Sequence, residues 1–170
     1  QQLKIEGTAK VASSKWDVHF GTVSKGNAQG YATAGTLAKT GETTIAGDIG
    51  TLKAPGDSIT YTFDIENAGD INAIIDTVTG GQSFTCTSAT KSVADAVCKD
   101  LTYSIKYTDG NATIAKGDKL AKATSASAPT KKNVTLTITY NKTDAQQTLA
   151  SEDVTVTADP MTITYVQDAK

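Results

Sequence analysis

Residues 58–66 read Ser-Ile-Thr-Tyr-Thr-Phe-Asp-Ile-Glu and form the clearest alternating stretch of this sequence. Large apolar side chains occupy every second position, and threonine or an acidic residue stands between them. Because successive side chains of a β-strand point to opposite faces, this pattern predicts a strand with one buried face. Threonine also favours half-buried pleated surfaces. The stretch therefore predicts a β-sheet core.

Similar alternation recurs on both sides of this strand. Turn-forming residues separate the segments, such as Ala54-Pro55-Gly56-Asp57 before the strand and Asn67-Ala68-Gly69-Asp70 after it. Residues 24–42 are rich in Gly and Ala and predict a long loop or a poorly specified strand, and only residues 90–97 have a helical pattern. We predict an all-β chain, a jelly-roll-like β-sandwich of about eight or nine strands. The further alternating segments are residues 71–79, 83–87, 101–107, 134–140, 154–156 and 161–165.

The amino-acid composition argues against several classes of function. The 170 residues include 29 Thr and 16 Lys but no Arg, and the net charge is −2. Phosphate and guanine recognition depend heavily on Arg, so we expect no nucleic-acid partner. One His and two Cys leave little from which to build a metal site, so we expect neither an enzyme nor a cofactor. No apolar run is long enough to predict a membrane-spanning helix.

Few side chains are candidates for chemistry. His19 is the only imidazole, and no nucleophile–base pair can be assembled without it, so we interpret it as a surface or interface histidine. Acidic residues are common, but several stand in turns, where side-chain bonds to the backbone explain them better than catalysis or calcium binding. These turn residues are Asp57, Asp70, Asp109 and Asp118.

Two features point to an oxidising, extracellular location. Cys86 and Cys98 flank the helical segment twelve positions apart, which favours a local disulfide over a pair of buried thiols. The chain starts at Gln1 without a leader segment, so we expect a mature, processed protein. Asn111, Asn133 and Asn141 each begin an Asn-x-Thr sequon, and we leave their glycosylation open because threonine is so frequent here.

The N-terminal segment alternates by itself. Its apolar positions are odd-numbered, whereas the apolar positions of the next alternating run, residues 16–20, are even-numbered. Because a one-residue shift moves every side chain to the other face, the two runs suit two different cores. We predict an N-terminal donor strand, residues 1–12, and a single β-sandwich domain, residues 13–170. The residues expected to contact another subunit are Leu3, Ile5, Gly7, Ala9 and Val11.

One further segment resembles a known family. Leu52-Lys53-Ala54-Pro55-Gly56-Asp57-Ser58-Ile59-Thr60, followed by Phe63-Asp64-Ile65-Glu66-Asn67-Ala68-Gly69, is similar to the L-K-P-G-D-x-h-T…F-x-h-x-N-x-G segment of secreted TasA/camelysin proteins. This sequence differs in its extra Ala54 and its cysteine pair. The resemblance implies a jelly-roll subunit of an extracellular fibre, such as a pilus or biofilm matrix fibre, of a kind that also occurs in archaea. In such fibres the N-terminal strand of one subunit completes the sheet of the next.

Three functions are therefore to be weighed. The first is a head-to-tail homopolymer assembled by the N-terminal strand, because strand addition between neighbours need not close on itself. The second is a monomeric cell-surface adhesin or carbohydrate-binding module, which requires an exposed aromatic row. The third is a pilin linked by Lys–Asn isopeptide bonds. The candidate aromatic residues for the second are Tyr103, Tyr107, Tyr140 and Tyr165.

Overall fold

The stretch that alternates most clearly becomes β7 (Ser58–Asn67), a central strand of the computed structural model, which describes residues 1–169. Buried and half-buried residues alternate along its whole length. Its neighbour β12 (Thr130–Tyr140) runs antiparallel to it and places Leu136 opposite Tyr61 and Val134 opposite Phe63. These facing apolar pairs form the centre of the core, as the alternation predicted.

The first layer of the molecule is the five-stranded sheet built around β7 and β12. Two short strands pair with β7 on its other edge, and one long strand pairs with β12. All of these pairings are antiparallel. The added strands are β1 (Val18–Phe20), β2 (Asn27–Gln29) and β10 (Leu101–Tyr107).

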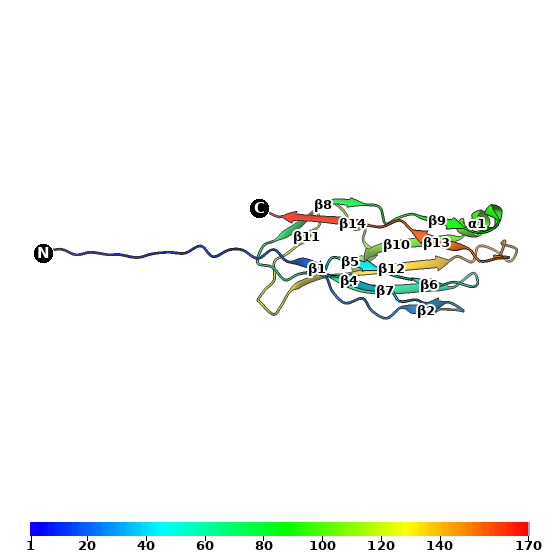
Figure 1. Ribbon diagram of the computed structural model, residues 1–170, viewed down its shortest axis with the longest axis horizontal. Helices are drawn as coiled ribbons and strands as arrows, with labels where there is room; N and C mark the ends of the chain where they lie inside the picture. The colour runs from blue at the N-terminus through cyan, green and yellow to red at the C-terminus, as the bar shows by residue number, and fades with distance from the viewer. Residues whose placement is uncertain (170) are drawn as a thin grey trace.

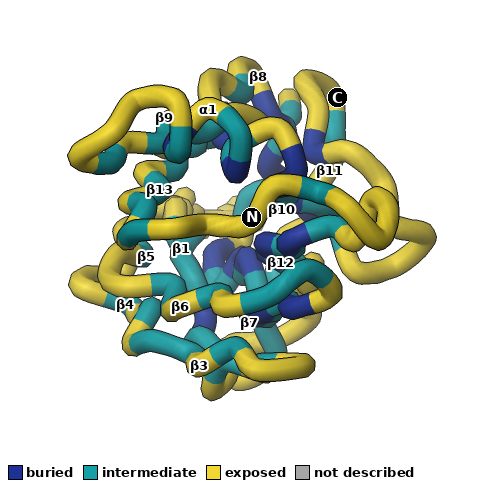
Figure 2. The backbone as a smooth tube through the Cα atoms, turned by 90° about the vertical axis from the view of Figure 1, so that its right-hand side faces the viewer, coloured by how far each residue is buried: buried dark blue, intermediate teal, exposed yellow. Residues whose placement is uncertain are grey.

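The second layer lies across the core from this sheet, as the view along the long axis shows (Figure 2). It consists of two antiparallel pairs of strands, and a fifth, short strand lies at the edge of one pair. Buried residues are concentrated between the layers. The second-layer strands are β8 (Ala73–Thr79), β9 (Phe84–Thr87), β11 (Lys119–Leu120), β13 (Thr155–Ala158) and β14 (Thr162–Gln167).

The all-β prediction is confirmed, but the described residues form fourteen strand segments rather than eight or nine. The breaks expected after residue 79 and between residues 156 and 161 are present. Gly80 and Gly81 both have positive φ and separate β8 from β9, and Pro160 lies between β13 and β14. Residues 33–51 form two further antiparallel pairs, β3 (Thr33–Ala34) with β6 (Gly50–Thr51) and β4 (Ala38–Gly41) with β5 (Thr44–Ala46).

The helical segment and the cysteine pair lie at one end of the body. The helix α1 (Lys91–Cys98) buries Ala94 and Val97, and Val97 packs in a small second core with Leu101 and Tyr140. The predicted disulfide between Cys86 and Cys98 is present, with the two Cα atoms 6.0 Å apart. It ties α1 to β9 at the end opposite the N-terminal arm (Figure 1). A one-turn 3-10 helix, η1 (Asp109–Asn111), follows β10.

The N-terminal residues form an arm that extends away from the body (Figure 1). Residues 1–17 have no regular secondary structure, and the arm is attached where Lys15 N–H donates to Asp70 Oδ1 at 2.7 Å. Three large apolar side chains of the arm are almost fully exposed: Leu3 at 92%, Ile5 at 99% and Val11 at 98%. The arm therefore does not fold back as the first strand of its own domain.

Candidate functional site

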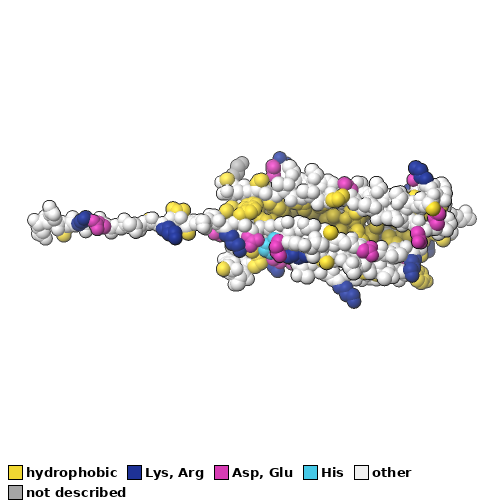
Figure 3. All heavy atoms as spheres, in the orientation of Figure 1, with side chains coloured by type: hydrophobic (Ala, Val, Ile, Leu, Met, Phe, Trp, Pro, Cys, Tyr) yellow, Lys and Arg dark blue, Asp and Glu magenta, His cyan; other side chains and the backbone are white. Residues whose placement is uncertain are grey.

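An open groove runs along the body between the two layers. Its volume is about 1390 Å³, and Figure 3 shows apolar side chains gathered in a band along this face. Both layers contribute to the lining. The lining includes Phe20, Phe63, Ile65, Leu136 and Ile138 from the first layer and Val156, Met161, Ile163 and Tyr165 from the second. Because apolar side chains line a groove that is open to solvent, the groove is a candidate interaction site.

Two chain segments form the rims of the groove. Residues 43–53, which contain β5 and β6, form one rim, and residues 150–165, which contain β13 and most of β14, form the other. Among residues 1–169, each rim strand is paired on one side only: β13 with β9, β14 with β8, β5 with β4 and β6 with β3. Their other edges carry backbone donors and acceptors that a further strand can pair with. The groove thus has the shape and edges of a site for one added strand.

The turn before β7 anchors one rim. The buried Asp57 carboxylate accepts hydrogen bonds from the backbone N–H groups of Tyr31 at 2.9 Å, Lys53 at 2.8 Å and Ala54 at 3.0 Å. Burial by itself raises the pKa of Asp57, but these bonds from Lys53, Tyr31 and Ala54 outweigh burial and hold the pKa below its usual value. Asp57 therefore fastens the end of the rim and the turn after β2 to the start of the central strand, and Ala54 supplies one of the three donors.

Gly50 allows this rim to lie close to the core. Its φ of 135° lies in a region that residues with a side chain rarely adopt. A Cβ atom there would also collide with the Thr33 carbonyl oxygen and lie 2.6 Å from Cδ1 of Ile59. Any other residue would push the rim away from the central strand and alter the groove.

His19 lies in a charged cluster near the base of the arm. Its Nδ1 lies 2.7 Å from Asp17 Oδ1, and its Nε2 lies 3.1 Å from Glu66 Oε2. Lys15 Nζ is 2.9 Å from Asp17, and Lys131 Nζ is 3.1 Å from Glu66. Hydrogen bonds from Lys15 and His19 lower the pKa of Asp17. The cluster fixes β1 and the base of the arm on the outer face of the first layer.

The other acidic turn residues mostly bind backbone groups, as turn chemistry predicts. Asp118 Oδ2 accepts hydrogen bonds from Ala115 N–H and from the Tyr107 hydroxyl, both at 2.8 Å. Asp70 binds Lys15, and Asp109 lies in the exposed turn η1. Within residues 1–169, no three His, Cys, Asp or Glu side chains are grouped so that they could share a metal ion.

The four tyrosines considered for carbohydrate binding do not form an exposed row. Tyr140 is 3% exposed, and the other three pack against the main core. Burial raises the pKa of Tyr103 and of Tyr165 to about 12, and burial together with Asp118 raises the pKa of Tyr107. Tyr165 and Tyr103 line the groove, so their rings form part of its apolar surface.

The sequon asparagines lie at three different places on the surface. Asn111 is exposed in η1 with a φ of 50°. Asn133 lies on the outer face of β12, where its side-chain amide donates to Asp64 Oδ1 at 2.9 Å. Asn141 is half-buried just beyond the end of β12. Their glycosylation stays a prediction.

Among residues 1–169, the predicted donor-strand residues pair with no other strand of the chain. They lie together on an exposed arm. Sequence reasoning missed the groove that lies on the body. A partial signal was present in residues 154–165, where apolar alternation changes phase at Pro160, as expected for a bent strand at a sheet edge. Residues 43–53 carry no comparable signal, because their role depends on packing against β7.

No family model, curated protein or solved structure matches this chain. Within residues 1–169, no helix is long and apolar enough to cross a membrane.

Proposed function

We propose that this protein is the structural subunit of an extracellular filament, a pilus or biofilm fibre, in which the arm of each subunit fills the groove of the next. One observation carries the proposal: a single chain has both an extended arm with exposed apolar side chains and an open apolar groove bordered by unpaired strand edges. Each feature is unfavourable in water alone, and each is suited to cover the other. The body is then a jelly-roll-type sandwich that lacks one strand until it assembles.

The dimensions of the two parts agree. At about 3.3 Å per residue, the nine residues from Leu3 to Val11 span about 30 Å, and the rim strands from Thr155 to Tyr165 span about 36 Å. Burying a Leu, Ile or Val side chain stabilises a complex by about 1.5–3 kcal/mol. The small side chains at Gly7 and Ala9 allow the middle of the strand to lie close to the groove floor.

Orientation favours a neighbour as the acceptor. The arm leaves the body at the end where β14 finishes and points away from it (Figure 1). A strand donated by a subunit placed end to end then runs antiparallel to β13 and β14, which matches every strand pairing within the body. Repetition of this contact gives an open polymer. The disulfide and the absence of a spanning helix from residues 1–169 are compatible with an extracellular location.

Deletion of residues 1–12 tests the proposal. Electron microscopy of the full chain at neutral pH should show filaments, and the truncated chain should remain a folded monomer. A matched pair of variants sharpens the test: Ile5→Asp places a charge on the apolar face of the arm and should prevent assembly, whereas Thr8→Asp places it on the other face and should not. Filaments of unchanged yield from the truncated chain would refute the proposal.

A further inference from the structure

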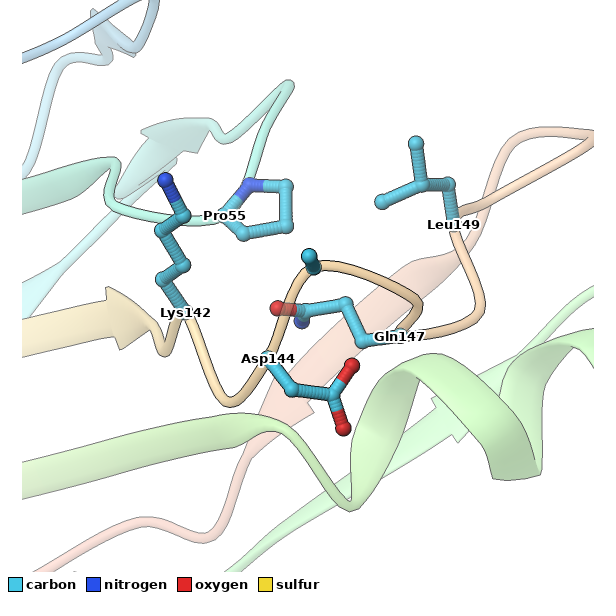
Figure 4. Close-up of a pocket in the computed structure, with 6 residues that line it drawn as sticks. Pro55, Lys142, Asp144, Gln147 and Leu149 are labelled. Atoms are coloured by element: carbon cyan, nitrogen blue, oxygen red, sulfur yellow. The ribbon is translucent and has the colours of Figure 1, made fainter.

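A second hollow lies where the groove opens at the end of the body farthest from the arm. This hollow, the mouth pocket, has a volume of about 400 Å³ and is lined by Pro55, Lys142, Asp144, Ala145, Gln147 and Leu149. Figure 4 shows Pro55 and Leu149 at its two sides. Pro55 follows the rim that ends at Lys53, and Leu149 precedes the rim that begins at Ala150, so the pocket continues the groove. Leu149 is 58% exposed.

A large apolar side chain is exposed at the opposite end of the body. Trp16, the only tryptophan of the chain, is 44% exposed at the base of the arm. Backbone bonds fix its position: Asp70 N–H donates to Lys15 O at 3.1 Å, and Ala68 N–H donates to Asp17 O at 2.9 Å. Trp16 therefore belongs to the rigid body and not to the extended part of the arm.

The connection between the arm strand and this rigid base is short. Only Ala12, Ser13 and Ser14 separate Val11 from Lys15, so the Cα atoms of Val11 and Lys15 are at most about 14 Å apart. A strand that ends at Val11 inside a neighbour's groove therefore brings the base of its own body to the mouth of that groove. Charged groups of both signs lie at the two places, because Lys15 next to Trp16 is paired with Asp17, and Lys142 and Asp144 both line the pocket.

We propose that Trp16 of one subunit packs between Pro55 and Leu149 of the next, in the mouth pocket. This inference rests on the proposed filament and adds a body-to-body contact to the strand contact. The contact closes the mouth of the groove over the inserted strand. It also limits the angle between successive bodies, because Trp16 is fixed to one body and the pocket to the other.

The fluorescence of Trp16 tests this contact directly, because no other tryptophan contributes to it. In filaments of the full chain, the emission should move to shorter wavelength and acrylamide quenching should fall several-fold relative to monomeric Ile5→Asp. Leu149→Ser should restore quenching in the filaments or weaken assembly, whereas Tyr31→Ser, which removes another exposed aromatic from a turn outside the pocket, should do neither. Tyr31 is therefore the matched control.

The outcomes separate the two proposals. Filaments in which Trp16 emission and quenching equal those of the monomer would overturn the contact and leave the filament proposal standing. Filaments with a protected Trp16 that Leu149→Ser leaves protected would overturn the assignment to the mouth pocket. A full chain that forms no filaments would overturn both proposals.

Discussion

The N-terminal arm and β7 have the same alternating pattern but opposite environments. Ile59 in β7 is fully buried, whereas Ile5 in the arm is 99% exposed. The difference arises from the partners of each segment: β7 has strands on both edges and a second layer over its apolar face, whereas the part of the chain that the structure describes provides no such neighbours for the arm. Alternation thus specifies that a segment has an apolar face, but the cover for that face can come from another molecule.

The same substitution made in both regions should have clearly different effects on the stability of the subunit. Ile59→Ala should lower the free energy of unfolding of the subunit by about 2–5 kcal/mol, because it leaves a cavity in the core. Ile5→Ala should leave subunit unfolding unchanged and weaken only the filaments. Urea unfolding of the monomer and dissociation of filaments measure the two effects. Equal destabilisation of the monomer by both changes would show that the arm folds onto its own body in solution.

The disulfide should have the next largest effect. Replacing Cys86 and Cys98 together by Ser removes a link that closes a loop with a sequence separation of 12, and should lower the free energy of unfolding by about 3 kcal/mol. Because β9 pairs with the rim strand β13, the groove should also loosen while the arm is untouched. Thermal unfolding and filament yield measure these losses. An unchanged melting temperature would contradict the expected role of the link.

A smaller effect is expected at Asp57, which anchors the start of β7. Among residues 1–169, the arm has no equivalent anchor for its alternating segment. Asp57→Asn removes charge-assisted bonds to three N–H groups and should cost about 1–3 kcal/mol. Because the folded pKa of Asp57 is lowered, its stabilisation is complete above its unfolded pKa, near pH 4, and is lost as pH falls through the folded pKa. The variant should therefore lose less stability than the wild type during acidification.

Chemical unfolding at several pH values between neutral and strongly acidic measures this difference. Asp109→Asn, at the exposed turn η1, is the matched control and should unfold like the wild type. A variant at Asp57 whose pH dependence equals that of the wild type would exclude the proposed anchoring by the carboxylate.

Local patterns predicted much of the fold. The strands around Ile59 and Ile138, the helix before Cys98 and the disulfide all follow from alternation, turn residues and cysteine spacing. Residues 27–41 were predicted only as a long loop or a poorly specified strand, because Gly and Ala residues carry little periodic signal. Their position depends on contacts with β7 and on close approaches such as the one at Gly50.

By itself, the sequence determined that this chain is a β-protein whose N-terminal segment alternates out of phase with the next run, because alternation and phase are local properties of neighbouring residues. Only the tertiary structure decided that the body leaves an open groove, that β13 and β14 present free edges to it, and that Trp16 and the mouth pocket lie at opposite ends. These features join residues far apart in the chain. Their positions follow from how the layers pack, and no local pattern encodes that packing.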